Sequence, residues 1–256
     1  MTDNVAFLTG DNCNVNKRIA RDKGKHFVGC SSHRFNLACE KFLKCAAVDR
    51  YYTKVADLMV SLRTYKNSAR LRRKTSLGPK RKNETRWTGA FDVIERYDRW
   101  CSDASFTLEE LFVDIDEVLQ KLPSPVENAR LKPIIEAMKI LRLVTQKLQE
   151  PTLTLLDARI AFDNVIAYFS EEGESTIKFD FEPYLGVNAQ IVDREISKDF
   201  ENGIVKLQTG LAQDLNTAET EAVTWFKNGD EVSPIYESVD ATTAFLAEIH
   251  GIIQPT

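Results

Sequence analysis

The sequence predicts an α+β protein in which a short β-α-β-α segment precedes a mostly α-helical remainder. Two short apolar runs near the N-terminus are typical of buried strands. Beyond Trp87, apolar residues recur mainly at helical spacing. A change of charge near residue 100 then indicates two domains, residues 1–100 and residues 101–256.

The N-terminal segment carries the strand signals. Val5–Thr9 is a continuous apolar run closed by a glycine, which predicts a buried strand with Asp11 at its end. Residues 12–16 offer several helix caps, and the helix that they begin is expected to reach Gly24. His26–Gly29 then resumes a strand, so the expected order is β-α-β.

Helical spacing takes over after the second strand. Ser31 or Ser32 can cap a helix whose apolar side chains step by three and four residues. The same pattern resumes after the tyrosine pair at positions 51 and 52. We expect the two stretches to form one buried stripe, made of Phe35, Ala38, Phe42, Ala46, Leu58, Leu62, Tyr65 and Ala69.

The second half is expected to be almost entirely helical. A helix that begins near Ser105 should reach Leu122. Two long amphipathic helices follow, the first with Pro133 in its first turn and Pro151 at its end, and the second closed by Gly173. Such stripes usually form the seam of an intramolecular bundle. The remaining expected elements are a weak strand at 177–181 and helices around 192–215, 218–227 and 238–250.

The composition excludes several classes of protein. With 43% hydrophobic and 28% charged residues, the chain is not disordered, collagen-like or of low complexity. Its apolar runs are shorter than the ~18 residues of a membrane span, and no signal segment opens it, so we expect a soluble intracellular protein without membrane contact. The five cysteines are an odd number and are expected to be reduced thiols.

The charge distribution gives the first indication of function. Residues 1–100 carry 22 Lys and Arg against 10 Asp and Glu, a net +12, whereas residues 101–256 carry 12 against 28, a net −16. Ten basic residues and one acid lie between Arg63 and Arg86. That density suits contact with DNA, although a solvated basic surface gives the same pattern. The cations expected to contact nucleic acid are Arg70, Arg72, Arg73, Lys74, Lys80, Arg81, Lys82 and Arg86.

Two further features accompany this basic segment, residues 63–86. Residues 70–82 resemble a nuclear import signal, so we expect a nuclear protein, with the cytoplasm as the alternative. Trp87 follows the segment, and an aromatic side chain there either stacks on a nucleic-acid base or fills a core. We include Trp87 in the expected nucleic-acid interface.

Asp11 is the strongest candidate for chemistry. A carboxylate at the end of a buried strand can hold a divalent ion against a phosphate, although such residues more often serve in turns and caps. Cys30 and His33 are two metal-ligand types at tight spacing. A structural zinc site normally pairs two short ligand spacings, and the second is missing here, so zinc is not expected. The alternative is a packed Cys30 and a hydrogen-bonded His33.

Four short motifs follow one another in a fixed order. They are Leu-Thr-Gly-Asp-Asn-Cys-Asn-Val-Asn-Lys at 8–17, Gly-Cys-Ser-Ser-His-Arg-Phe-Asn-Leu-Ala at 29–38, Thr-Arg-Trp at 85–87 and Glu-Arg-Tyr at 95–97. In this order they resemble the catalytic core of hAT superfamily DNA transposases. The sequence of the expected helices at 141–163 is similar to the start of that family's inserted domain. The resemblance covers roughly residues 5–170. It implies a partial ribonuclease-H-like α/β core followed by an α-helical insertion domain.

The resemblance also implies roles for single residues. Asp11 matches the second carboxylate of the family's Asp-Asp-Glu site for Mg²⁺ or Mn²⁺, and Cys30 and His33 match its Cys-x2-His element. Arg86 and Trp87 match its Arg-Trp pair, whose Trp handles the DNA strand near the cleavage point. The family's first Asp precedes the strand of Asp11 and its Glu follows the insertion, and this sequence matches neither. We therefore expect an internal fragment of a transposase, or a domesticated or degenerate copy.

The expected mechanism follows from the metal site. Two-metal cleavage of a phosphodiester needs several carboxylates, and one Asp does not supply them. We expect a transposase-like, DNA-associated protein without independent catalysis. One alternative is a protein-interaction module whose basic half is a solvated surface and whose acidic helices bind protein partners. Another is an active metal-dependent nuclease or transposase that recruits other acids, such as Asp49, Asp57 or Asp92.

Overall fold

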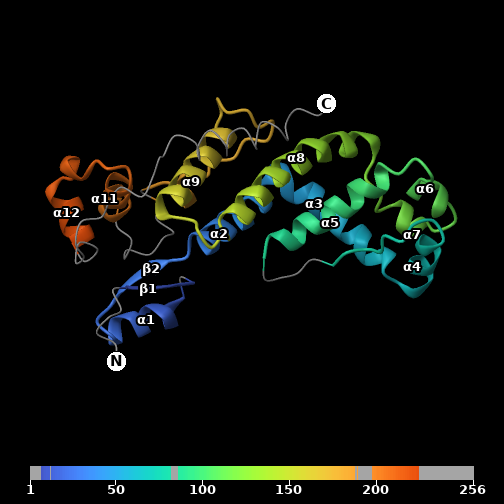
Figure 1. Cartoon of the computed structure of the whole chain (residues 1–256). Coiled ribbons are helices and arrows are strands. Elements are labelled where there is room, and N and C mark those ends of the chain that lie inside the picture. The colour runs from blue at the N-terminus through green and yellow to red at the C-terminus, as the bar shows by residue number, and fades with distance from the viewer. Residues whose placement is uncertain (1–6, 12, 82–85, 188, 190–197, 225–256) are drawn as a thin grey trace. The chain divides into compact units, whose positions relative to one another are not determined.

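The computed structural model describes residues 7–11, 13–81, 86–187, 189 and 198–224. Within these residues the protein is mostly helical and contains one parallel pair of strands, which agrees with the α+β class (Figure 1). No helix in this part of the chain is long and apolar enough to cross a membrane.

The chain packs as two compact units, and their boundary does not follow residue 100. The first unit contains the described parts of Met1–Ala38, Val144–Glu174 and Asp180–Thr256, and the second those of Cys39–Leu143 and Ser175–Phe179. The chain leaves the first unit within α2 (Ser31–Leu43) and returns to it within α8 (Pro125–Lys147). Most of the basic segment therefore lies in a helical unit, while the strands share a unit with C-terminal helices.

The first unit begins with two parallel strands. β1 (Phe7–Gly10) pairs with β2 (His26–Gly29), and α1 (Asn14–Asp22) connects them. Figure 1 shows α1 beside both strands, which it contacts. Gly24 closes α1 at φ +59°, in the left-handed region that favours glycine. The β-α-β-α order expected from the sequence is observed, but β1 is not the buried strand that was expected, because Leu8 is half-buried and Thr9 is exposed.

Helices from the second half of the chain complete the first unit. They are α9 (Leu155–Phe169), α10 (Glu182–Leu185), α11 (Lys198–Gln208), the 3-10 turn η1 (Ala212–Asp214) and α12 (Thr217–Val223). Val28 of β2 packs in a buried cluster with Phe200 and Ile204 of α11 and Val223 of α12. A Cβ at Gly203 would lie 2.7 Å from the Val223 side chain, so glycine allows α11 and α12 to pack closely.

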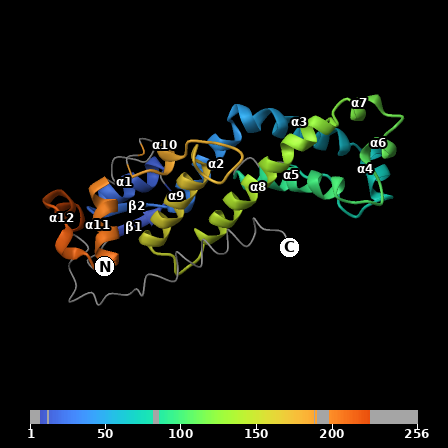
Figure 2. The same cartoon turned by 90° about the horizontal axis from the view of Figure 1, so that it is seen from above.

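The second unit is a bundle of helices. Its elements besides parts of α2 and α8 are α3 (Ala46–Leu62), α4 (Tyr65–Arg72), α5 (Thr88–Cys101), α6 (Leu108–Leu111) and α7 (Asp116–Leu119). Figure 2 shows α5 beside α3 and α8, and ion pairs join these helices: Lys54 of α3 to Glu127 of α8, and Asp92 of α5 to Arg142 of α8. The core between them contains large side chains such as Leu58, Phe91 and Phe112.

The expected single helix from Ser105 to Leu122 was wrong. The structure has two one-turn helices there, α6 and α7. Phe112 and Val118 are both fully buried, yet six residues apart they would point in different directions on one continuous helix of 3.6 residues per turn. The break after Leu111 lets both side chains reach the core.

Other expected elements also changed. Pro133 lies inside α8 rather than in its first turn, because a capping box between Ser124 and Glu127 starts the helix at Pro125. The residues at 177–181 are irregular rather than a strand. α11 and α12 lie within the helical stretches expected at 192–215 and around 218–227, and the helix expected at 238–250 lies outside the described residues.

Candidate functional site

The candidate metal residue lies where β1 meets α2. Asp11 directly follows β1, and its side chain is 68% exposed. The Cys30 backbone N–H donates a hydrogen bond to the Gly10 carbonyl at 2.8 Å, which brings the start of α2 to the end of β1. His33 Nδ1 lies 4.0 Å from Asp11 Oδ1. The structure thus gathers Asp11, Cys30 and His33 at one edge of the strand pair, although they are distributed over two sequence motifs.

This cluster supplies few metal ligands. In the described part of the chain, no group of three or more His, Cys, Asp or Glu side chains is placed to hold a metal ion. The Asp11 backbone carbonyl accepts hydrogen bonds from Asn16 Nδ2 at 2.9 Å and from the Cys13 N–H at 2.7 Å, which is a turn role. The carboxylate itself remains exposed, so a divalent ion there would depend on oxygen ligands besides Asp11.

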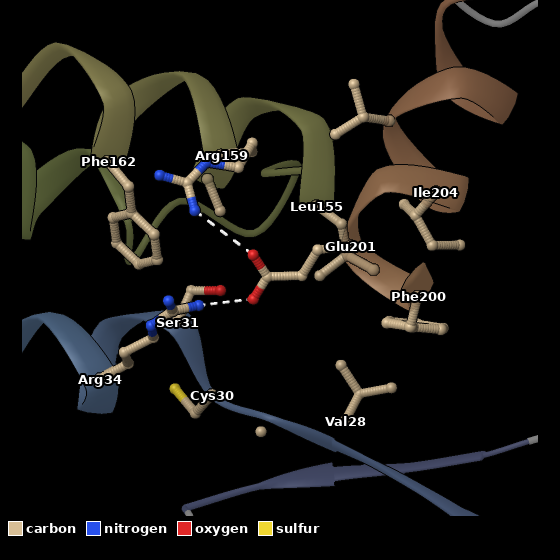
Figure 3. A pocket seen from close by; sticks show the side chains of 13 residues that line it. Val28, Cys30, Ser31, Arg34, Leu155, Arg159, Phe162, Phe200, Glu201 and Ile204 are labelled. Carbon is tan, nitrogen blue, oxygen red and sulfur yellow. Dashed lines mark hydrogen bonds and ion pairs between the residues drawn. The ribbon is translucent and has the colours of Figure 1, made fainter. Parts of the chain in front are cut away.

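A pocket of the first unit lies beside this edge and is lined by β2, α2, α9 and α11 (Figure 3). Three charged side chains occupy its centre. Arg34 Nη1 donates to Glu201 Oε1 at 2.6 Å, and Arg159 Nη1 donates to Glu201 Oε2 at 3.3 Å. Both guanidinium groups lie over the Phe162 ring, that of Arg34 at 5.2 Å and that of Arg159 at 5.5 Å from the ring centroid. One carboxylate thus bridges two arginines over an aromatic ring.

Both arginines also donate hydrogen bonds to backbone carbonyls in and after α10. Arg34 donates to the carbonyls of Tyr184 and Gly186 at 3.0 and 2.7 Å, and Arg159 donates to that of Leu185 at 2.7 Å. Each arginine side chain is only 9% exposed. Burial lowers the pKa of Arg34, and the neighbouring Glu201 partly offsets that effect. The three side chains therefore tie α2, α9 and α11 to the α10 segment.

Most of the expected DNA-contacting cations are exposed in the second unit. Arg72 ends α4, and Arg73 and Lys74 follow it. The next loop is fixed on α5, because Arg96 Nη1 donates to the Gly78 carbonyl at 2.8 Å and Trp100 Nε1 donates to the Leu77 carbonyl at 3.1 Å. We call the exposed cations of this region the basic surface: Arg72, Arg73, Lys74, Lys80, Arg81 and Arg86.

Two expected cations do not belong to the basic surface. Arg70 is half-buried, pairs with Asp114 and lies 5.8 Å over the Phe112 ring. Its charge is therefore already used within the unit. Lys82 lies outside the described residues.

Trp87 is a core residue of the second unit. Its side chain is 1% exposed, and its ring centroid lies 6.4 Å from that of Phe91. This burial favours the interpretation in which Trp87 fills a core over the one in which it stacks on a base. Arg86 beside it is exposed.

Two members of the expected buried stripe are exposed, so the expectation was wrong for them. Ala46 begins α3 and is exposed. The Tyr65 side chain is 89% exposed. The reason is a helix break: α3 ends at Leu62, and the Thr64 hydroxyl caps a new helix by accepting the Asn67 N–H at 3.4 Å. The new helix has its own phase, which turns Tyr65 outward.

The comparisons with known proteins name no relative. Neither a protein-family model nor a curated protein nor a solved structure matches this chain. The functional argument therefore depends on the chain's own residues.

Proposed function

We propose that this chain is a hAT transposase-like, DNA-associated nuclear protein that binds DNA through the basic surface and does not cleave DNA by itself. The observation that carries the proposal is the gathering of exposed cations at the end of α4 and in the loop that follows. Each such cation can neutralise one phosphate and release a counterion.

The surroundings of these cations favour a ligand over a structural role. Arg72, Arg73 and Lys74 form no ion pair with another described residue. The backbone of the loop is already held on α5 through Leu77 and Gly78, so binding would order side chains rather than a whole segment. Exposed cations without an acidic partner among the described residues can pair with phosphates.

The first unit supports the transposase-like part of the proposal. A parallel strand-helix-strand with a carboxylate at the end of its first strand agrees with a ribonuclease-H-like core. The nearness of Asp11, Cys30 and His33 agrees with motifs that converge on one site. In this proposal the helical residues from 101 onward correspond to the inserted domain.

The proposal that the chain does not cleave DNA by itself rests on the number of metal ligands beside Asp11. The described strand-end cluster offers one carboxylate, which does not fit a site for two metal ions. We therefore expect the purified chain to leave supercoiled plasmid DNA intact in Mg²⁺ or Mn²⁺. Nicking that disappears in the Asp11→Asn variant would instead support the active alternative.

Fluorescence anisotropy with a labelled DNA duplex tests the binding proposal. We expect the triple variant Arg72→Ala, Arg73→Ala, Lys74→Ala to bind about tenfold or more weakly than the wild type at low salt. The matched control is the double variant Lys121→Ala, Lys139→Ala, which removes lysines that pair with Glu117 and Glu136 in the same unit. Its affinity should stay close to that of the wild type.

Equal affinities of the wild type and the triple variant would contradict the proposal. The basic surface would then be a solvated surface. The protein-interaction alternative would take its place.

A further inference from the structure

The exposed face of α4 combines an aromatic ring with positive charge. Tyr65 is the one aromatic residue among the strongly exposed large apolar side chains in the described part of the chain. A lone exposed apolar side chain needs no explanation by itself. Tyr65 differs from such a lone side chain, because the exposed cations Arg63 and Lys66 flank it along the chain.

Helix geometry extends this face to the basic surface. Residues seven apart lie on the same side of a helix, so Arg72 lies on the face of Tyr65 and Arg73 on that of Lys66. Arg72 also donates to Ser68 Oγ at 2.9 Å, which holds its guanidinium back along the helix toward the N-terminal turn. The ring therefore lies on a face that carries cations at both ends.

We propose that Tyr65 is a stacking platform for an unpaired base, and that the α4 face binds single-stranded DNA. The inference rests on the proposed function and deepens it by naming the form of DNA. In a duplex, neighbouring base pairs cover both faces of each base. Only an unpaired base offers a face to an exposed ring, while the cations alongside bind its phosphates.

The face fits this ligand better than it fits an acidic protein segment. Positive charge alone would serve both ligands, since carboxylates and phosphates are both anions. An outward ring adds base stacking, which is tolerant of sequence and strengthens single-strand binding. Binding of single-stranded DNA therefore depends on the Tyr65 ring, whereas binding of an acidic protein segment depends only on the cations.

The test compares two forms of DNA with two variants. Anisotropy is measured with an oligodeoxythymidylate of about 20 nucleotides and with a duplex of the same length. We expect Tyr65→Ala to weaken single-strand binding by about five- to 150-fold and to leave duplex binding nearly unchanged. Tyr65→Phe keeps the ring and should retain single-strand affinity. Val126→Ala removes a side chain that is 73% exposed on α8 and serves as the control.

A direct readout of stacking accompanies the affinities. A 2-aminopurine base within the single strand should lose fluorescence on binding to the wild type and to Tyr65→Phe, and should lose much less with Tyr65→Ala. Unchanged single-strand affinity and quenching in Tyr65→Ala, or equal losses on both forms of DNA, would overturn the stacking role while duplex binding by the wild type stands. If the wild type binds neither form, the proposed function fails together with this inference.

Discussion

The two units use positive charge in opposite ways. In the first unit, Arg34 and Arg159 are 9% exposed and share the Glu201 carboxylate. In the second unit, Arg73 and Lys74 are exposed after the end of α4 and have no described acidic partner. The charge of the sequence does not distinguish buried from exposed arginines, since Arg34 and Arg73 both belong to the net positive charge of residues 1–100. Burial and partners decide which arginines hold the fold and which stay available for a ligand.

The largest expected effect comes from breaking the buried network. Glu201→Gln keeps the shape of the side chain but leaves Arg34 and Arg159 without their shared charge partner. We expect the free energy of unfolding to fall by about 3–5 kcal/mol, because the Arg34 charge stays uncompensated in a poorly solvated site, whereas Arg159 keeps its ion pair with Asp163. Urea denaturation followed by circular dichroism measures the change.

Glu221→Gln is the control for this prediction, because Glu221 is exposed on α12. Its effect should stay within about 0.5 kcal/mol. If Glu201→Gln were as mild as this control, the Glu201 bridge would not hold the first unit together.

A smaller effect separates two arginines near the basic surface. We expect Arg73→Ala to reduce the salt dependence of DNA binding by roughly 0.9 in the slope of log affinity against log salt. Arg70→Ala should reduce this slope clearly less, because Arg70 already pairs with Asp114. Titrations of both single variants at several salt concentrations measure the difference. A larger slope change for Arg70→Ala would mean that an existing ion pair does not remove a cation from DNA binding.

The smallest expected effect concerns a pair of intermediate exposure. The hydrogen bond from Lys54, together with the Ser124 backbone N–H, lowers the pKa of Glu127 to about 2. A carboxyl whose pKa is lowered in the folded state stabilises the fold above its usual pKa near 4.5 and loses that contribution as the pH falls through about 2. The stability difference between the wild type and Glu127→Gln should therefore shrink over this range.

Thermal unfolding at several pH values checks this prediction. The whole effect should be below about 1 kcal/mol, because the Lys54 side chain is 32% exposed and solvent screens the pair. Glu136→Gln, which removes an acid from the exposed pair with Lys139, is the matched control. If the stability difference between the wild type and Glu127→Gln stayed constant with pH, Glu127 would not contribute to the loss of stability in acid.

Local signals predicted the beginning of the fold. A glycine after an apolar run marked β1, and Gly24 marked the end of α1, because these signals act within a few residues. The phase of successive helices was harder to predict. Thr64 restarts the helix and turns Tyr65 outward, and a periodicity read through that break places the ring in the core.

The site was predictable only in part. The motifs indicated Asp11 and the basic segment from sequence alone, but not the pairing of Arg34 with Glu201, which are 167 residues apart. One signal did exist: Arg159 interrupts the apolar stripe of α9, and a charged residue there needs a partner. The sequence identifies one partner, Asp163, which lies four residues later on α9 and pairs with Arg159 at 2.7 Å. It does not identify the second, because only the packing of α9 against α11 brings Glu201 to Arg159.

The most direct test of the central claim is the salt dependence of duplex binding by the wild type and by the triple variant Arg72→Ala, Arg73→Ala, Lys74→Ala. If these exposed cations contact phosphates, log affinity of the wild type falls linearly with log salt. The slope of the variant is then shallower by about 2.7, or 0.9 for each lost contact. Parallel lines for the two proteins would contradict the claim that this surface of the second unit binds DNA.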